Sequence, residues 1–124
     1  MKRTTTVVSA TVVRRSARVP PEGQSCCPLF HEGVELIGKR WTGAIIHVLL
    51  VSEPLRFSEI AQAVPELSDR LLSERMKELE SRGLVRREVI SGSPTRVEYS
   101  LTDMGRDLAN AVREIKAWAH RWLQ

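Results

Sequence analysis

The sequence predicts a mainly α-helical domain with one small β-hairpin, the arrangement of the winged helix-turn-helix class. A short helical segment, a tight turn and a strongly amphipathic helix follow one another over residues 58–82. Two segments with extended patterning around a Ser/Gly/Pro turn come directly afterwards, over residues 84–101. A further helical segment with regularly spaced apolar residues then closes the chain. This order of elements is typical of a helix-turn-helix followed by a wing.

Length and composition fit one globular domain. The 124 residues allow one modest core, and no apolar run approaches the roughly 20 residues that cross a bilayer. Residues 4–13 are Thr-rich and only weakly apolar, so we expect neither a signal peptide nor a membrane partner. The two cysteines, Cys26 and Cys27, are adjacent and therefore unsuited to a disulfide bond that closes a loop. A cytoplasmic location is the simplest interpretation.

The formal net charge of +4 is concentrated at the N-terminus. Residues 1–25 hold five basic side chains and one acidic side chain, and the remaining charges cancel. This stretch is also rich in Pro, Gly, Ser and Thr, so we interpret it as a flexible basic arm. We interpret residues 26–124 as the winged helix-turn-helix domain, which would carry DNA binding and dimerisation. Because this domain is formally neutral, overall charge does not by itself indicate nucleic-acid binding.

The first two helices are predicted from apolar spacing and end signals. Pro28 suits the first position of a helix that runs to Gly38. A second helix covers about residues 40–51 and ends before Pro54. Its apolar stripe consists of Trp41, Ile45, Val48 and Leu49. Residues 55–57 are expected to be extended.

The next two helices are predicted from N-cap residues. Ser58 and Ser68 each suit the cap of a helix, and Glu59 would lie in the first turn of the shorter one. The shorter helix closes before Pro65, and the longer one ends at Gly83.

The pattern becomes extended after the longer helix. Residues 84–90 and 96–101 are predicted strands, joined by the turn 91–95. Val97, Tyr99 and Leu101 alternate on one side of the second strand and are expected to pack beneath the hairpin. Thr102 is expected to cap a single long last helix.

The helix over residues 69–82 presents a polar face opposite its apolar stripe. Leu72, Met76 and Leu79 share one side at about 100° per residue. The opposite side carries Arg, Lys, Ser and Glu side chains, which pair with base edges and phosphates in a major groove. The start of the helix also offers backbone N–H groups to a phosphate. The predicted DNA contacts are Ser68, Arg70, Ser73, Glu74 and Lys77.

A solvated face is the alternative interpretation of this helix. Arg70 and Glu74 have the i,i+4 spacing of a surface ion pair, and polar faces opposite a core stripe are common. The helix-turn-helix and hairpin context favours DNA reading.

Arginines on the hairpin add a second predicted contact. Arg86 and Arg87 are neighbours on a strand and point to opposite faces, so at most one faces a duplex. Arg96 lies at the loop exit and is the better candidate for a phosphate or minor-groove contact. A cross-strand pair of Arg96 with Glu88 or Glu98 is the alternative.

These motifs together resemble the HxlR-type bacterial regulators, over about residues 27–122. The matching segments are Cys27-Pro28, Leu36-Ile37-Gly38-Lys39-Arg40-Trp41, Arg56-Phe57-Ser58-Glu59-Ile60, residues 72–80, Gly83-Leu84-Val85, Arg96-Val97-Glu98-Tyr99-Ser100-Leu101-Thr102 and Gly105. The resemblance implies a dimeric winged-helix regulator, acting as repressor or activator, whose first and last helices build the dimer interface. One departure is the run Gly38-Lys39-Arg40-Trp41, where the family usually has Gly-Gly-Lys-Trp, and it concerns the local turn geometry.

The last helix carries a second apolar feature. Trp118 and Trp122 have i,i+4 spacing and share a face. Packing within one subunit is one interpretation, but a small domain rarely needs so long an apolar helix for itself, which favours a dimer contact. Two-fold symmetry would also match a palindromic operator. The predicted interface comprises Leu29, Phe30, Ile115, Trp118 and Trp122.

Cys27 precedes Pro28 at a helix start, where the helix dipole would favour a thiolate. The resemblance implies that a cysteine at this position can sense oxidants or electrophiles, and a half-buried structural cysteine is the alternative.

The histidines are scattered and show no zinc-like spacing with cysteine. With no phosphate loop, nucleophile elbow or carboxylate pair, we expect no metal, no cofactor and no enzyme activity.

The predicted function is therefore sequence-specific binding of double-stranded DNA by a homodimeric transcriptional regulator. An unidentified small-molecule effector, in a pocket between the core and the dimer helices, is a further expected partner. A winged helix that binds a protein partner is the alternative from another class. Steep salt dependence of DNA binding would separate the two.

Overall fold

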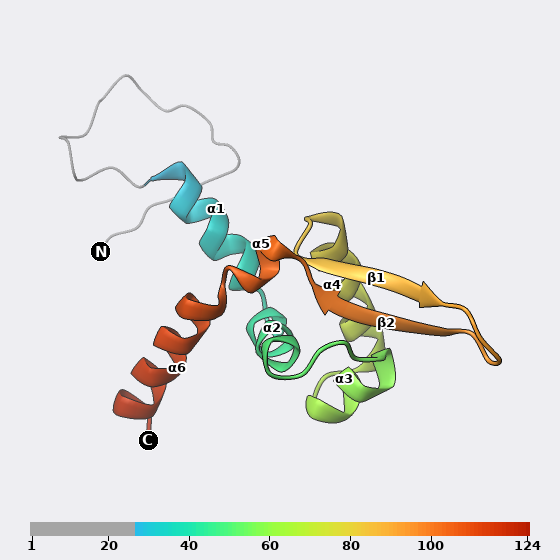
Figure 1. Ribbon diagram of the computed structural model, residues 1–124. Helices are drawn as coiled ribbons and strands as arrows, with labels where there is room; N and C mark the ends of the chain where they lie inside the picture. The colour runs from blue at the N-terminus through green and yellow to red at the C-terminus, as the bar shows by residue number, and fades with distance from the viewer. Residues whose placement is uncertain (1–26) are drawn as a thin grey trace. The chain divides into compact units, whose positions relative to one another are not determined.

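The computed structural model describes residues 27–124, and the chain divides at Gly38 into two parts. Helix α1 (Pro28–Ile37) belongs to the first part and begins at Pro28, as predicted. The amide N–H of His31 donates to the carbonyl oxygen of Cys27 at 3.0 Å and closes its first turn. The predicted arm lies outside the described residues, so the domain division stays a prediction. All other elements belong to the second part (Figure 1).

Helix α2 (Thr42–Val51) begins later than predicted. Trp41 has a left-handed backbone with φ of 74° and stands outside the helix. The predicted stripe was therefore wrong in its first member, because the left-handed residue turns the chain before the helical spacing starts. The Arg40 guanidinium lies 5.4 Å from the centre of the Trp41 ring. The buried apolar residues of α2 are Ile45, Ile46 and Leu49.

The helix-turn-helix consists of α3 (Phe57–Ala63) and α4 (Asp69–Ser81). Ser58 was wrongly predicted as a cap, since α3 already begins at Phe57 and Arg56 holds the cap position. Glu59 secures this start, because its Oε1 accepts from the Arg56 N–H at 2.8 Å. Ser68 caps α4 as predicted, with its Oγ accepting from Leu71 N at 3.2 Å.

Gly83 ends α4 as predicted, with a left-handed φ of 86°. The next N–H, of Leu84, donates to Leu79 O at 2.9 Å, and Gly83 N donates to Glu80 O at 3.1 Å. These two bonds satisfy the last carbonyls of the helix and turn the chain directly into the first strand.

The wing is the antiparallel hairpin of β1 (Val85–Ile90) and β2 (Arg96–Leu101), with Val85 opposite Leu101. Leu55 pairs with Tyr99 at the open edge of β2, through bonds of 2.9 and 2.7 Å. The predicted extended piece over residues 55–57 is therefore present at Leu55, but it was wrong at Phe57, which already begins α3. The loop end of the hairpin projects away from the helices (Figure 1).

The predicted long last helix is in fact two helices, α5 (Asp103–Arg106) and α6 (Ala109–Trp122). Thr102 caps the first of them, accepting from Gly105 N at 3.2 Å. Leu108 N then donates to Gly105 O, three residues back, so a tighter turn separates the helices. Glu53 holds α5 near the end of β2, since it accepts from Leu101 N at 2.7 Å and from Arg106 Nε at 3.0 Å.

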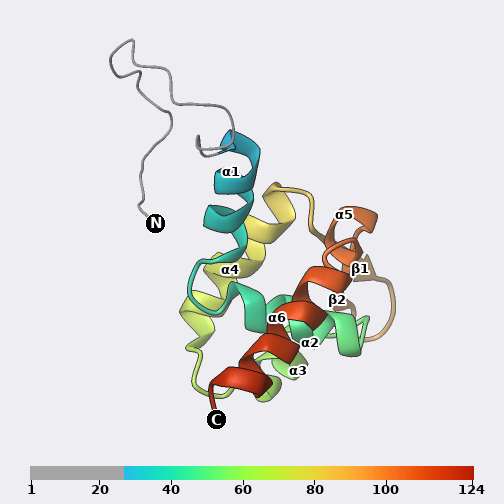
Figure 2. The ribbon, with the colours of Figure 1, turned by 90° about the vertical axis from the view of Figure 1, so that its left-hand side faces the viewer.

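The core lies between α2, α3, α4 and the base of the hairpin. Its buried apolar side chains are Ile45, Ile46, Leu49, Ile60, Val64, Leu67, Leu72, Met76, Leu79, Leu84, Val85 and Leu101. Helix α6 lies against α2 but buries none of its own side chains completely (Figures 1 and 2). No helix within residues 27–124 is long and apolar enough to span a membrane.

Candidate nucleic-acid interface

The polar side of α4 faces outward, as predicted. The Arg70 side chain is 90% exposed and its Nε lies 3.7 Å from Glu74 Oε2, so the i,i+4 pair considered above is present. Such exposed pairs contribute little to stability and can be exchanged for other partners. The pair therefore leaves both residues available to a ligand. Ser73 and Lys77, on the same helix, border a hollow that Arg87 and Tyr99 of the wing also line.

Other charged residues of α4 serve the fold. Glu78 forms an ion pair with Lys39, and Arg75 Nε donates to Arg40 O at 3.0 Å. These contacts tie α4 to the segment that precedes α2. Glu78 and Arg75 therefore hold the helix in place, whereas Arg70 and Glu74 face outward.

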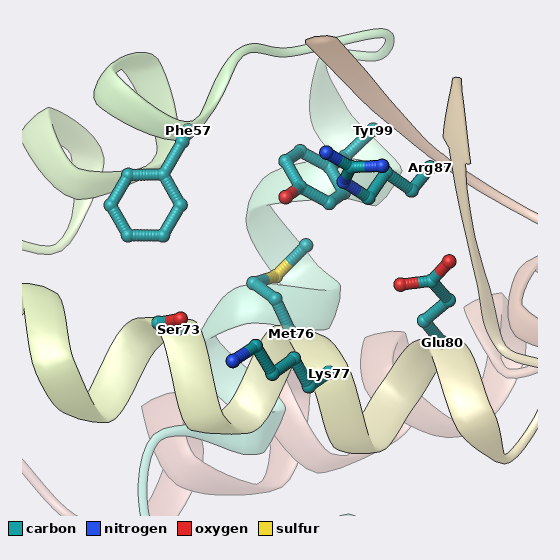
Figure 3. Close-up of a pocket in the computed structure, with 7 residues that line it drawn as sticks. All are labelled: Phe57, Ser73, Met76, Lys77, Glu80, Arg87 and Tyr99. Carbon is teal, nitrogen blue, oxygen red and sulfur yellow. The ribbon is translucent and has the colours of Figure 1, made fainter. Parts of the chain in front are cut away.

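A hollow of about 330 Å³ lies between α4 and the wing (Figure 3). Figure 3 shows Lys77, Ser73 and Glu80 rising from α4, with Arg87 and Tyr99 above them on the hairpin. The complete lining is Phe57, Ser73, Met76, Lys77, Glu80, Arg87 and Tyr99. Sequence reasoning found Ser73 and Lys77, and it missed the aromatic residues, Glu80 and the position of Arg87.

The strand register assigns the hairpin arginines to faces. Arg87 is paired with Tyr99 and has the same strand parity as the buried Val85. Arg86, paired with Ser100, takes the other face. Alternation alone left this choice open, and the pairing with Tyr99 could not be read from spacing.

Arg96 lies on the face opposite to Arg87 by the same alternation. Its Nε donates to Glu98 Oε2 at 2.8 Å. The ion pair considered for Arg96 is therefore present, but along one strand, two residues apart. It is not a cross-strand pair, because Glu98 stands opposite Glu88 in the register.

Helices α1 and α6 carry exposed apolar side chains. On α1, Leu29 is 78% and Phe30 is 68% exposed. On α6, Trp118 and Trp122 are 50% and 67% exposed, and Ile115 is 57% exposed. An apolar groove between α2 and α6 adjoins Ile115, and Lys116 Nζ lies 3.5 Å from His47 Nε2 beside it.

Cys27 is exposed at the start of α1. Among residues 27–124 no cluster of three or more metal-ligating side chains occurs. Arg70, Ser73, Glu74 and Lys77 thus lie on one helix, with Ser68 as its cap. Arg96 lies on the wing, and Cys27 directly precedes α1.

Comparison with known families supports this arrangement of elements. Residues 36–124 match the family model described as HxlR-like helix-turn-helix. The chain belongs to the HxlR-like helix-turn-helix family. This HxlR-like protein is 50% identical over 97 residues to the uncharacterized HTH-type transcriptional regulator YvaP of Bacillus subtilis, covering 78% of this chain and 89% of YvaP. It is 41% identical over 102 residues to the transcriptional regulator YodB of the same organism, covering 82% and 90%.

Solved structures of relatives have the same fold as this HxlR-like protein. The reduced form of YodB aligns with a TM-score of 0.71 and 42% identity, over 79% of this chain and 95% of YodB. The redox regulator HypR in its reduced form aligns with a TM-score of 0.70 and 33% identity, over 75% and 91%. A quinone-bound form of YodB is also similar, with a TM-score of 0.67 and 41% identity, over 78% and 100%. The protein is a winged helix-turn-helix transcriptional regulator, and its family is not one of enzymes.

Proposed function

We propose that this regulator binds a palindromic operator as a homodimer, with α4 in the major groove. The observation that carries the proposal is the outward polar face of α4, where Arg70, Glu74 and Lys77 stand opposite the buried stripe. Ser68 and Ser73 supply further hydrogen-bonding groups on the same helix. Arg96 contacts a phosphate beside the wing loop after releasing Glu98.

The dimer interface consists of α1 and α6. Leu29, Phe30, Ile115, Trp118 and Trp122 are large apolar side chains, each at least half exposed. Exposed apolar surface of this kind marks sites where another protein packs. A second copy of the chain is the occupant that a palindromic operator requires.

Cys27 serves as the sensor that releases DNA. It is exposed, and the relatives crystallised include a quinone-bound and a diamide-treated YodB. A thiol adds to a quinone ring carbon, forming an S–C bond while the ring takes up the proton and becomes a hydroquinone. The adduct at the start of α1 would bias the dimer arrangement on which operator binding depends.

Selective recovery of DNA tests the function. The protein is mixed with fragmented genomic DNA, and bound fragments are compared with scrambled DNA by fluorescence anisotropy at several salt concentrations. We expect enriched fragments that bind at least about 10³-fold more tightly than scrambled DNA, with steep salt sensitivity. Arg70→Ala should weaken operator binding roughly tenfold. No enriched fragment would contradict the proposal and favour a protein-binding winged helix.

Cysteine variants test the sensor. A stoichiometric quinone should weaken operator binding by the wild type roughly 5- to 150-fold. Cys27→Ser should retain full affinity in the presence of the quinone, and Cys26→Ser is the matched control that should respond like the wild type. Mass spectrometry checks that the adduct is on Cys27. Quinone-induced release that persists in Cys27→Ser would exclude this residue as the sensor.

A further inference from the structure

The hollow between α4 and the wing contains two cations without an anionic partner. Within residues 27–124, neither Lys77 nor Arg87 forms an ion pair, whereas Arg70, Arg96 and Arg106 all do. Lys77 approaches from the helix and Arg87 from the hairpin, so the two charges border one space (Figure 3). Glu80 is the one acidic residue among the lining residues. The lining therefore carries a net charge of +1.

The shape of the wing explains why Arg87 borders this space. Val85 and Leu101 form the buried base of the hairpin, and Arg87 and Tyr99 follow as the next pair on that inner face. Beyond the core, Arg87 and Tyr99 line the hollow together with residues of α4 (Figure 3). The pairing with Tyr99 holds Arg87 in this position, while the charge of its guanidinium remains unneutralised.

We propose that this hollow binds a phosphate of the DNA backbone, held between Lys77 and Arg87. The proposal rests on the function proposed above, because α4 in the major groove brings the flanking backbone past the wing. Arginine and lysine are the usual donors to phosphate oxygens, and donors on two elements fix the register of the protein on the duplex. Lys77 is then a positioning contact to the backbone, and Arg87 adds a second cation of the wing to Arg96.

Anisotropy with paired arginine variants tests the site. Arg87→Ala should weaken binding to operator and to scrambled DNA by the same factor, several-fold, and lower the slope of log K against log salt by about 1. Arg86→Ala is the matched control, since it removes the same charge from the opposite face of the same strand. It should leave the slope nearly unchanged. Arg87→Lys keeps the charge and should retain the slope, which separates loss of charge from misfolding.

The outcomes separate this proposal from the proposed function. A wild type that prefers no DNA overturns both. Specific wild-type binding with equal effects of Arg87→Ala and Arg86→Ala overturns the phosphate site alone, as does a selective loss of operator over scrambled DNA. Inorganic phosphate, added at constant ionic strength, is the remaining arm. Inorganic phosphate could displace DNA from the wild type but not from Arg87→Ala, while Arg87→Ala leaves the salt slope of DNA binding unaltered. In that case the hollow binds a free phosphate instead.

Discussion

Replacing Gly105 by alanine is expected to destabilise the regulator by about 3 kcal/mol, one of the largest effects available to a single methyl group. A Cβ at this position would lie 2.3 Å from the carbonyl oxygen of Leu84 and 2.9 Å from Leu101 Cδ2. The Leu84 oxygen also accepts from Thr102 N at 3.0 Å, so it cannot withdraw without losing that bond. The melting temperature should fall by roughly 10 °C or more.

Thermal unfolding followed by circular dichroism measures this effect. Gly43→Ala is the matched control, because a Cβ there meets no atom within 4 Å. Alanine within α2 should leave stability unchanged or raise it slightly. Equal melting temperatures for Gly105→Ala and the wild type would show that Gly105 of α5 does not lie against Leu84 and Leu101.

Truncating both tryptophans of α6 is expected to convert the proposed dimer into a monomer. Trp118 and Trp122 are 50% and 67% exposed, so each presents a large apolar surface that the subunit itself does not cover. Burying aromatic surface of this size dominates the energy of many interfaces. Since the proposed dimer holds its operator through two linked half-site contacts, Trp118→Ala with Trp122→Ala should lower operator affinity roughly 10²- to 10⁴-fold.

Sedimentation velocity gives the oligomeric state and anisotropy gives the affinity. Met104→Ala is the control, because Met104 is also exposed, at 53%, but lies on α5. That variant should remain dimeric with normal affinity. A double tryptophan variant that stays dimeric would refute the role of α6, whereas a monomer with undiminished affinity would refute the need for dimerisation.

Several features of the protein follow from local sequence alone. The stripe of Leu72, Met76 and Leu79 identified the helix that carries the polar face, because helical spacing is a property of the segment itself. Ser68 and Gly83 marked its two ends, since caps act on neighbouring backbone groups. The hairpin was likewise predicted from alternation and its turn residues. The family resemblance, and with it the function, also came from these motifs.

Other features were decided by contacts between distant segments. Spacing joined α5 and α6 into one helix, but the chain turns after α5, which Glu53 holds from the end of α2. Trp41 looked helical by spacing but has a left-handed backbone, and Arg40 beside it is held by Arg75, 35 residues further along the chain.

The arginines of the wing show the same division most clearly. The sequence by itself determined that Arg86 and Arg87 point to opposite faces, since alternation is built into any strand. Only the tertiary structure decided that Arg87 faces α4, because this depends on the register with Tyr99 and on Val85 and Leu101 packing into the core. Local periodicity sets which residues share a face, and long-range packing sets what that face meets.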